Sequence, residues 1–421
     1  MSSASPGALA RCGGSPVRTR RANRTRRAHR ASFVLDTSIL VALLAASSAP
    51  TPLYPHYQHQ WGLSALTITL VFSAYSLTLL LVLLITGALS DHLGRRPVLG
   101  GALVLAAAAM ALLAAAGGSN ALIAARILQG AATAAATSAA GAALLDLEDP
   151  ARPGRSALTN GIAPVAGMAV GVLASTLLIR LAPDPTVTVY VLLAALFAAQ
   201  AVAVAFTTET AHRHAGAWRS LRPHLSVPSS ARRALRLTGA GIAAVWALGG
   251  FYSSLGPALV RLVSPGGPGA AGGMIFFTVT AMAAFTVWTV RRTAPAVAAT
   301  AGCAAVVPAA ALTVGSLHGG GLPALFGGAA MAGIAFGAVS QGALRITLTA
   351  LSERDRAATL AAYYVLSYLS MSLPAIAAGA AAGRYGLGTA SHTYAAAAAL
   401  LAIVAVAALT VSRRSPIDES R

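Results

Sequence analysis

The chain has 421 residues, of which 56% are hydrophobic and only 10% are charged, and its mean hydropathy is +0.70. Soluble domains carry roughly a quarter charged residues, so a soluble globular fold is excluded. The net charge of +19 would suggest nucleic acid as a partner of a soluble protein. Here eight arginines lie in the first 30 residues without interleaved aromatic residues. Nucleic acid is therefore not expected as a partner. Residues 1–31 are predicted as a disordered basic tail at lipid head groups, with a cleaved signal peptide as the weaker alternative.

Uncharged runs of about 20 residues recur along the whole chain, and this is the length that a helix needs to cross a bilayer. They predict an all-α membrane protein with twelve transmembrane helices. The polar segment 207–236 divides them into two six-helix bundles, 32–206 and 237–411, and is predicted as a cytoplasmic linker before a tail at 412–421. The predicted spans are 32–50, 65–90, 97–116, 120–145, 156–180, 187–206, 237–262, 272–290, 296–316, 322–348, 356–381 and 389–411.

All 30 basic residues are arginines, and most of them lie in segments that share one side of such a topology. Positive loops stay in the cytoplasm, so both termini are predicted to be cytoplasmic. The absence of lysine beside abundant alanine, glycine and arginine is typical of a high-G+C genome. We expect a monomer in the inner membrane of a bacterium, with the lipid bilayer, protons and a small-molecule substrate as its partners.

A charged turn interrupts the apolar sequence at residues 87–97, which read GALSDHLGRRP. Gly87 would let two helices approach closely, and Gly94 would permit a tight reversal of the chain. Asp91 ends one span, while Arg95 and Arg96 open the next. We predict a latch in which these charges pair with one another or with helix ends. The alternative, that the two arginines only fix the topology, does not explain the spacing of the glycines and the aspartate.

This turn resembles the signature between the second and third helices of the major facilitator superfamily, in which Gly-x-x-x-Asp precedes Gly-Arg-Arg. His92 stands where the family usually has a basic residue, and it could make the latch sensitive to pH. The resemblance covers residues 32 to 411. It implies a secondary transporter whose two bundles rock about a central site while the charged turn stabilises one state. We expect no enzymatic activity, metal site or cofactor.

An embedded charge lies in the fourth predicted span, where ARILQG places Arg126, Gln129 and Gly130. An arginine inside a span costs roughly 2.5 kcal/mol or more to insert, which makes it a functional candidate. The motif is similar to an Arg-x-x-Gln-Gly element of the superfamily, and the resemblance implies that Arg126 and Gln129 contribute to proton coupling. The alternative is that the Arg126 side chain extends to the outer surface.

Glycines and a proline recur in the fifth predicted span, within NGIAPVAGMAVG. Gly167 and Gly171 form a small-residue face for close helix packing, and Pro164 permits a bend. Gly130 is expected to serve the same packing and gating role in the fourth span. The segment resembles a Gly/Pro-rich element of proton-coupled exporters, but its order of glycine and proline differs. A packing role and an export-specific role therefore both remain open.

One acidic residue, Asp36, lies inside a predicted span, in the stretch FVLDTSILVALL. A carboxylate in apolar surroundings can bind and release a proton near neutral pH, so Asp36 is a candidate proton carrier. Helix geometry places it about 6 Å from the inner side and Arg126 about 9 Å from the outer side, which leaves ~15 Å between them. The alternative is a carboxylate that reaches the inner interface.

The embedded charges bear on the class of substrate. With one embedded acid, a site for polycations is not supported, whereas embedded arginines favour a neutral or anionic solute. We expect proton-coupled efflux of a small hydrophobic or amphipathic compound by alternating access. The alternative is uptake or facilitated diffusion of an organic anion or other metabolite. The candidate cavity residues are Tyr75, Trp246, Tyr252, Gln341, Tyr363, Tyr364 and Tyr368.

Overall fold

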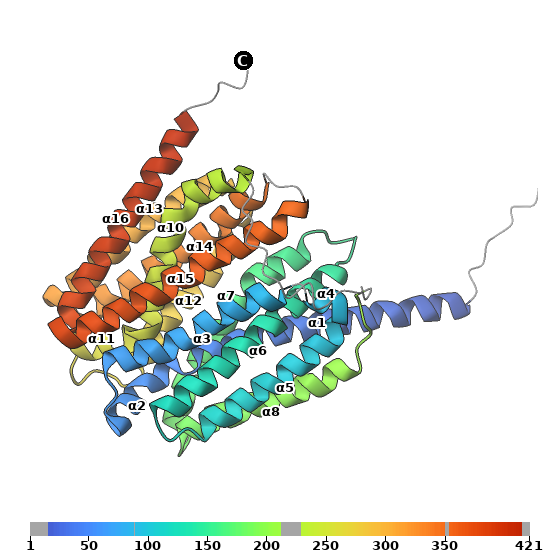
Figure 1. Ribbon diagram of the computed structural model, residues 1–421, viewed down its shortest axis with the longest axis horizontal. Coiled ribbons are helices and arrows are strands. Elements are labelled where there is room, and N and C mark those ends of the chain that lie inside the picture. Colours follow the sequence, from blue (N-terminus) through green and yellow to red (C-terminus); the bar gives the residue numbers. More distant parts are fainter. Residues whose placement is uncertain (1–15, 88, 212–228, 350–352, 415–421) are drawn as a thin grey trace, which may run out of the picture.

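The computed structural model describes residues 16–87, 89–211, 229–349 and 353–414, and nearly all of them are helical (Figure 1). The predicted tail segments 1–15 and 415–421 and the linker segment 212–228 lie outside the described residues. The first half contains α1 (Pro16–Ser48), η1 (Thr51–Leu53), α2 (Tyr54–Trp61), α3 (Ala65–Thr86), α4 (Leu89–Leu93), α5 (Arg95–Ala114), α6 (Ser119–Asp146), α7 (Arg155–Leu181) and α8 (Pro185–Ala205). The second half contains α10 (Ser229–Ser254), α11 (Gly256–Val263), α12 (Ala271–Thr289), η2 (Val290–Arg292), α13 (Pro295–Gly315), η3 (Ser316–Gly320), α14 (Gly321–Thr349), α15 (Glu353–Tyr385) and α16 (Leu387–Arg414).

Eleven helical stretches of the described chain are long and apolar enough to cross a membrane. The longest runs from Pro295 to Leu348, and it reverses at His318 and Gly319, whose backbone angles are not helical. Gly319 has a φ of 97°, in the left-handed region that glycine adopts most readily. Because α13 and α14 pack side by side, this stretch contains two crossings. The described helices thus make the twelve crossings that the sequence predicted.

Two element ends differ from the expectation. The prediction of a disordered tail is wrong for residues 16–31, because α1 begins at Pro16 and continues into the first span. Arginine and alanine dominate this segment, and both have high helix propensity. The predicted linker likewise ends early, because α10 begins at Ser229.

Each half of the chain has its own apolar core. The first core is built almost entirely from residues 33–204, and the second almost entirely from residues 242–409. Small residues such as Ala132, Ala136 and Ala139 contribute much of the first core, so helix axes can approach closely there. The chain therefore forms two helical bundles, although the exact domain limits remain a prediction.

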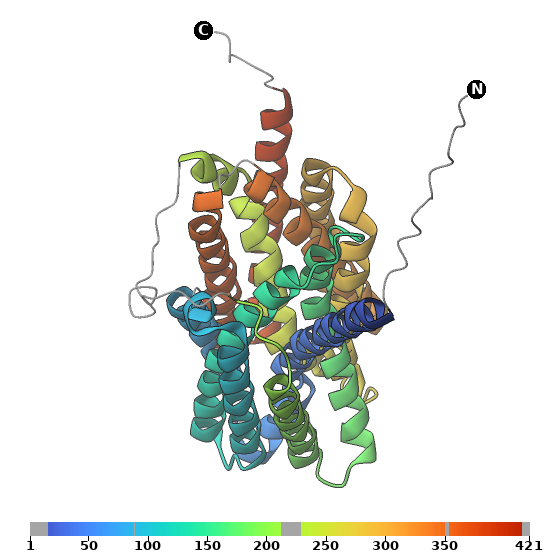
Figure 2. The ribbon, with the colours of Figure 1, turned by 90° about the vertical axis from the view of Figure 1, so that its right-hand side faces the viewer.

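The two bundles meet through α3 against α15 and through α7 against α12. Hydrogen bonds join them at the end that carries α2 and α11: Arg261 Nη2 donates to Gln58 Oε1 at 2.8 Å. About halfway along α3 and α15, the hydroxyls of Ser76 and Ser372 lie 2.7 Å apart. The start of α1 and the end of α16 leave the body in different directions (Figures 1 and 2). These hydrogen bonds thus hold the bundles together at the α2 and α11 end and about halfway along α3 and α15.

Candidate transport site

Arg126 is buried inside the first bundle, with only 1% of its surface exposed. Its Nη1 donates to the carbonyl oxygen of Ser47 at 3.1 Å and to Oε1 of Gln129 at 2.7 Å. Its guanidinium carbon lies 4.5 Å from the ring centroid of Tyr75 on α3. The last carbonyl groups of a helix lack partners within the helix and carry the negative end of its dipole. The end of α1 is therefore a favourable place for this cation.

Buried polar atoms surround this guanidinium. Among the described residues, the Nε of Arg126, the Nε2 of Gln129 and the hydroxyls of Tyr54 and Tyr75 are buried and make no hydrogen bond of good geometry. The Tyr54 hydroxyl lies beside the guanidinium, and that of Tyr75 lies near Ser47 and Thr133. Each unpaired group costs about 1–3 kcal/mol relative to a paired one. Tyr54, which lies beside Arg126 at the start of α2, was not predicted from the sequence. The Pro-rich stretch TPLYPHY indicates a loop there, and only the burial of its tyrosines marks it as part of the site.

An aromatic cluster occupies the second bundle. The indole of Trp246 on α10 lies 5.2 Å from the ring of Phe336 on α14 and 5.2 Å from that of Tyr368 on α15, between ring centroids. Tyr364 lies 6.2 Å from Tyr368, and Tyr363 lies 5.6 Å from Tyr364. Among the described residues, Trp246 Nε1 and the hydroxyls of Ser340 and Ser367 in this cluster are buried without a hydrogen bond of good geometry, and all three lie around the hydroxyl of Tyr363.

Tyr75 and Tyr368 connect the two groups, because Tyr368 packs against the cluster of Tyr75, Leu79 and Ala134 across the boundary between the bundles. The structure therefore brings together five of the predicted cavity residues: Tyr75, Trp246, Tyr363, Tyr364 and Tyr368. We define this set, with Arg126, Gln129 and Tyr54, as the central site.

Two other predicted cavity residues lie elsewhere. Tyr252 is fully buried in the core of the second bundle, where its hydroxyl lies 2.6 Å from Oγ1 of Thr313. Gln341 faces α7 instead, since its Oε1 lies 4.0 Å from the position that a Cβ of Gly161 would take. The contacts of Tyr252 are those of a core residue, and Gln341 lies at a separate contact between the bundles.

Asp36 is buried in α1, at 6% exposure, and has no hydrogen-bond or ion-pair partner among the described residues. It does not meet Arg126. Ser47, whose carbonyl accepts a hydrogen bond from Arg126, lies about 16 Å beyond Asp36 along the same helix. This agrees with the separation that the sequence predicted, and the role of Asp36 in proton transfer stays a prediction.

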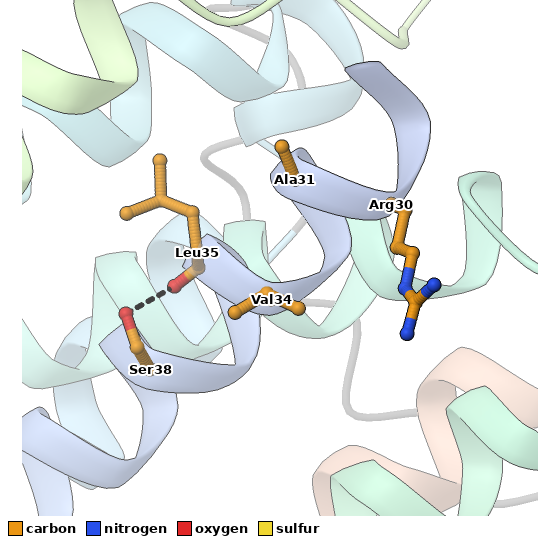
Figure 3. A pocket seen from close by; sticks show the side chains of 5 residues that line it. All are labelled: Arg30, Ala31, Val34, Leu35 and Ser38. Atoms are coloured by element: carbon orange, nitrogen blue, oxygen red, sulfur yellow. Dashed lines mark hydrogen bonds between the residues drawn. The ribbon is translucent and has the colours of Figure 1, made fainter. Parts of the chain in front are cut away.

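A shallow hollow of about 520 Å³ lies along one side of α1 (Figure 3). Apolar side chains provide most of its lining, and Ser38 points its hydroxyl at the carbonyl of Leu35, 2.7 Å away. Its lining residues are Arg30, Ala31, Val34, Leu35 and Ser38. None of them belongs to the central site, and Val34 is 55% exposed, so the hollow belongs to the outer side of the bundle.

The charged turn forms a network that extends beyond the predicted latch. Arg95 pairs with Asp91 and, through its Nε, with Asp146 Oδ2 at 3.2 Å. Arg96 donates to the carbonyl oxygen of Ala205 at the end of α8. Gly94 has a φ of 102°, a left-handed value that explains the need for glycine at the reversal, and the carbonyl of Gly87 accepts a hydrogen bond from α6. The network therefore ties α4 and α5 to the ends of α6 and α8.

Glu209 joins this network from the chain that follows α8. Its Oε1 accepts the backbone N–H of Arg95 at 2.8 Å, and its Oε2 accepts that of Arg96 at 3.2 Å. A carboxylate at this position satisfies two of the N–H groups that lack partners at the start of α5. Glu209 and Asp146 were not predicted from the sequence, because each contact joins residues more than fifty positions apart.

Replacing Glu209 should weaken this cap. We expect Glu209→Gln to lower the stability of the protein by about 0.5–1 kcal/mol, since the amide keeps one acceptor oxygen and loses the charge. Glu209→Ala should cost more. Thermal unfolding of the purified protein measures both changes. Asp149→Asn, in the loop between α6 and α7, is the matched control and should have little effect. Equal stability of all variants would contradict the capping role.

The predicted packing glycines lie where helices touch. A Cβ at Gly167 would lie 2.5 Å from the carbonyl oxygen of Val41 on α1, and one at Gly171 would lie 2.5 Å from the Cα of Ala45. A Cβ at Gly130 would meet the backbone of Tyr75 on α3. Pro164 lies inside α7, which continues through it. The three glycines therefore permit contact between helix backbones, and their role in gating stays a prediction.

Comparisons with known proteins agree on a family. A family model described as the Major Facilitator Superfamily matches residues 37–320. A search of curated protein sequences found no significant match. Three solved structures share the fold over most of the chain. The first is a bacterial homologue of the human lysosomal transporter Spinster, in an inward-facing and unoccupied conformation, with a TM-score of 0.71 and 14% identity over 92% of this chain and 99% of that one.

The other two transport different solutes. The nucleoside transporter NupG has a TM-score of 0.68 and 12% identity over 90% of this chain and 98% of that one. The human organic anion transporter MFSD10 has a TM-score of 0.67 and 20% identity over 90% of this chain and 99% of that one. At these identities the likeness concerns the fold alone. The family match extends over more than half of the chain, and this multi-pass membrane protein therefore belongs to the major facilitator superfamily, whose transporters act on small molecules.

Proposed function

We propose that the chain is a secondary active transporter that exports a small amphipathic compound across a bacterial inner membrane in exchange for protons. The two bundles would rock about the central site, exposing it first to one side and then to the other. The observation that carries the coupling to protons is the burial of Asp36 without a partner among the described residues. An ionisable residue in a membrane span is costly and is usually functional.

The contacts between the bundles support one assignment of the conformational state. They include the hydrogen bond of Arg261 with Gln58 at the end that carries α2 and α11, and that of Ser76 with Ser372 about halfway along α3 and α15. With both termini in the cytoplasm, that end faces outwards, and these contacts would close the central site on that side. Gly161, beside Val287 and Gln341, joins the bundles again nearer the opposite end. The similarity to an inward-facing Spinster homologue is consistent with this assignment.

The exchange can be tested with purified protein in proteoliposomes that contain a trapped pH dye. A panel of neutral, anionic and cationic amphipathic compounds is added to one side, and the proton flux is recorded. Export by exchange predicts proton movement opposite to that of the compound. Movement in the same direction would replace export by uptake, and compound flux without proton movement would replace coupling by facilitated passage. Protein-free liposomes are the control.

Asp91→Asn should slow transport and leave the protein folded. Asp91 is exposed and its partner Arg95 keeps Asp146, so we expect a change of less than about 1 kcal/mol in stability. The latch contributes to one state of the cycle, so we expect the transport rate to fall several-fold. Initial rates in proteoliposomes and thermal unfolding measure the two effects. Wild-type rates in this variant would contradict the latch.

A further inference from the structure

We infer that Arg126, with Gln129, Tyr54 and Tyr75, is a recognition site for the carboxylate group of the transported compound. This inference rests on the proposed function and names the class of its substrate. The remainder of such a compound would be apolar or aromatic, to match the cluster of Trp246 and its neighbours in the second bundle. Three features of Arg126 support it: its charge, its unused donors and its position.

Arg126 has no counter-ion in the part of the chain that the structure describes. Its partners are a carbonyl oxygen, an amide oxygen and the face of the Tyr75 ring, and none of these carries a full negative charge. Within the described membrane spans, Asp36 is the acid placed inside the bundle, and it lies on α1 about 16 Å from the Ser47 carbonyl that Arg126 holds. A meeting would require α6 to slide along α1 by that distance. Since no acid of the described residues reaches Arg126, we place the charge that neutralises it on a bound ligand.

The unused hydrogen-bonding groups match a carboxylate. Among the described residues, the guanidinium donates hydrogen bonds of good geometry through Nη1 alone, and its Nε is buried without such a bond. The Tyr54 hydroxyl lies beside the guanidinium. The Nε2 of Gln129 is a donor, and the hydroxyls of Tyr54 and Tyr75 can donate as well. An ionised carboxylate only accepts hydrogen bonds, and the planar guanidinium fits it in two-point contact. None of the described residues around Arg126 is an acid that could bind a cationic ligand.

The position of these groups suits a transported compound. Tyr75 stacks on Arg126 in the first bundle, and the cluster that contains it packs against Tyr368 of the second. A ligand held by Arg126 would thus lie beside the boundary that changes when the bundles rock. Behind Tyr368, the rings of Trp246 and Phe336 offer an apolar surface for the rest of the molecule.

One test needs no ligand. Oε1 of Gln129 already lies 2.7 Å from Nη1 of Arg126, so Gln129→Glu places an internal carboxylate on the guanidinium. We expect this variant to unfold at a higher temperature than the wild type. Gln200→Glu is the matched control. Gln200 is buried like Gln129, but its Oε1 has no partner and its Nε2 bonds only to Ser38 among the described residues. This control should unfold at a lower temperature. If both variants are destabilised equally, Arg126 does not require an anion and the inference is overturned.

The second test measures binding to the purified full-length protein with three probes that share one body: naphthalene-2-acetate, its amide and the corresponding naphthyl-ethylamine. We expect the carboxylate to bind at least 10-fold more tightly than the amide, and Arg126→Gln to remove this preference. Arg126→Lys should keep part of it. Arg345→Gln is the control for loss of a different arginine from a span, since Arg345 donates to the carbonyl of Thr293, and it should bind as the wild type does.

The outcomes separate this inference from the proposed function. A carboxylate preference that persists in Arg126→Gln, or the lack of any preference in the wild type, overturns the anion site. Proton-coupled movement of a neutral compound that survives Arg126→Gln would also overturn it while leaving the coupling intact. A carboxylate preference without any proton movement would instead contradict only the exchange with protons.

Discussion

Gly171→Leu should leave little folded protein in the membrane. At this position α7 touches α1 backbone to backbone, and a Cβ would lie 2.5 Å from the Cα and 2.6 Å from the carbonyl carbon of Ala45. Neither atom can move without displacing a helix. Two hydrogen bonds flank the contact: Ser48 Oγ donates to the carbonyl of Met168 at 2.8 Å, and Ser175 Oγ donates to that of Ala49 at 2.8 Å. Separating the helices would break both.

The smaller change Gly171→Ala should fold but unfold at a lower temperature. Overpacking costs about 1–3 kcal/mol, and the loss of the flanking hydrogen bonds would add to this. Gly101→Ala in α5 is the control, because open space surrounds that position and alanine favours a helix. Size-exclusion profiles and thermal unfolding of the three variants measure the effect. A Gly171→Ala protein as stable as Gly101→Ala would show that α1 and α7 do not depend on this close approach.

The sequence predicted the crossings well because each depends on a local property. A run of about 20 apolar residues must cross the membrane as a helix, whatever lies around it. Even the reversal between α13 and α14 could be placed, since polar and glycine residues interrupt the apolar run at SLHGG. The start of α1 was mispredicted, because a basic segment rich in arginine and alanine is compatible with both a coil and a helix.

The site could be predicted only in part, because its contacts join distant segments. The motif around Arg126 indicated a functional residue, but the neighbouring Tyr54 belongs to a stretch that reads as a loop. The charges of the turn could be identified as a group, whereas the contributions of Asp146 and Glu209 depend on where α6 and α8 end in space. Sequence patterns report the residue types that a site needs, and the packing of helices decides which of them meet.

Asp36→Asn should abolish proton-driven transport and preserve exchange of the compound. The amide has the size of the carboxylic acid but cannot ionise, so the transporter would stay in a form equivalent to the one with protonated Asp36. Because Asp36 makes no hydrogen bond to the described residues, its replacement breaks no contact and the protein should remain folded. We expect accumulation driven by a pH gradient to fall at least about 10-fold, to the level of protein-free liposomes.

The two transport modes distinguish a proton carrier from a structural residue. Counterflow of a labelled compound against the unlabelled one needs only the movement of the loaded carrier, so it should continue in Asp36→Asn at a rate close to that of the wild type. Asp184→Asn, in the exposed turn between α7 and α8, controls for the loss of an acid and should affect neither mode. Loss of counterflow as well would mean that Asp36 is needed for the motion of the bundles. Undiminished proton-driven accumulation would mean that the proton uses another group. About three turns of α1 separate Asp36 from Ser47, the residue that binds Arg126. A proton on Asp36 and a compound at Arg126 would therefore influence each other through the movement of α1 and not by direct contact.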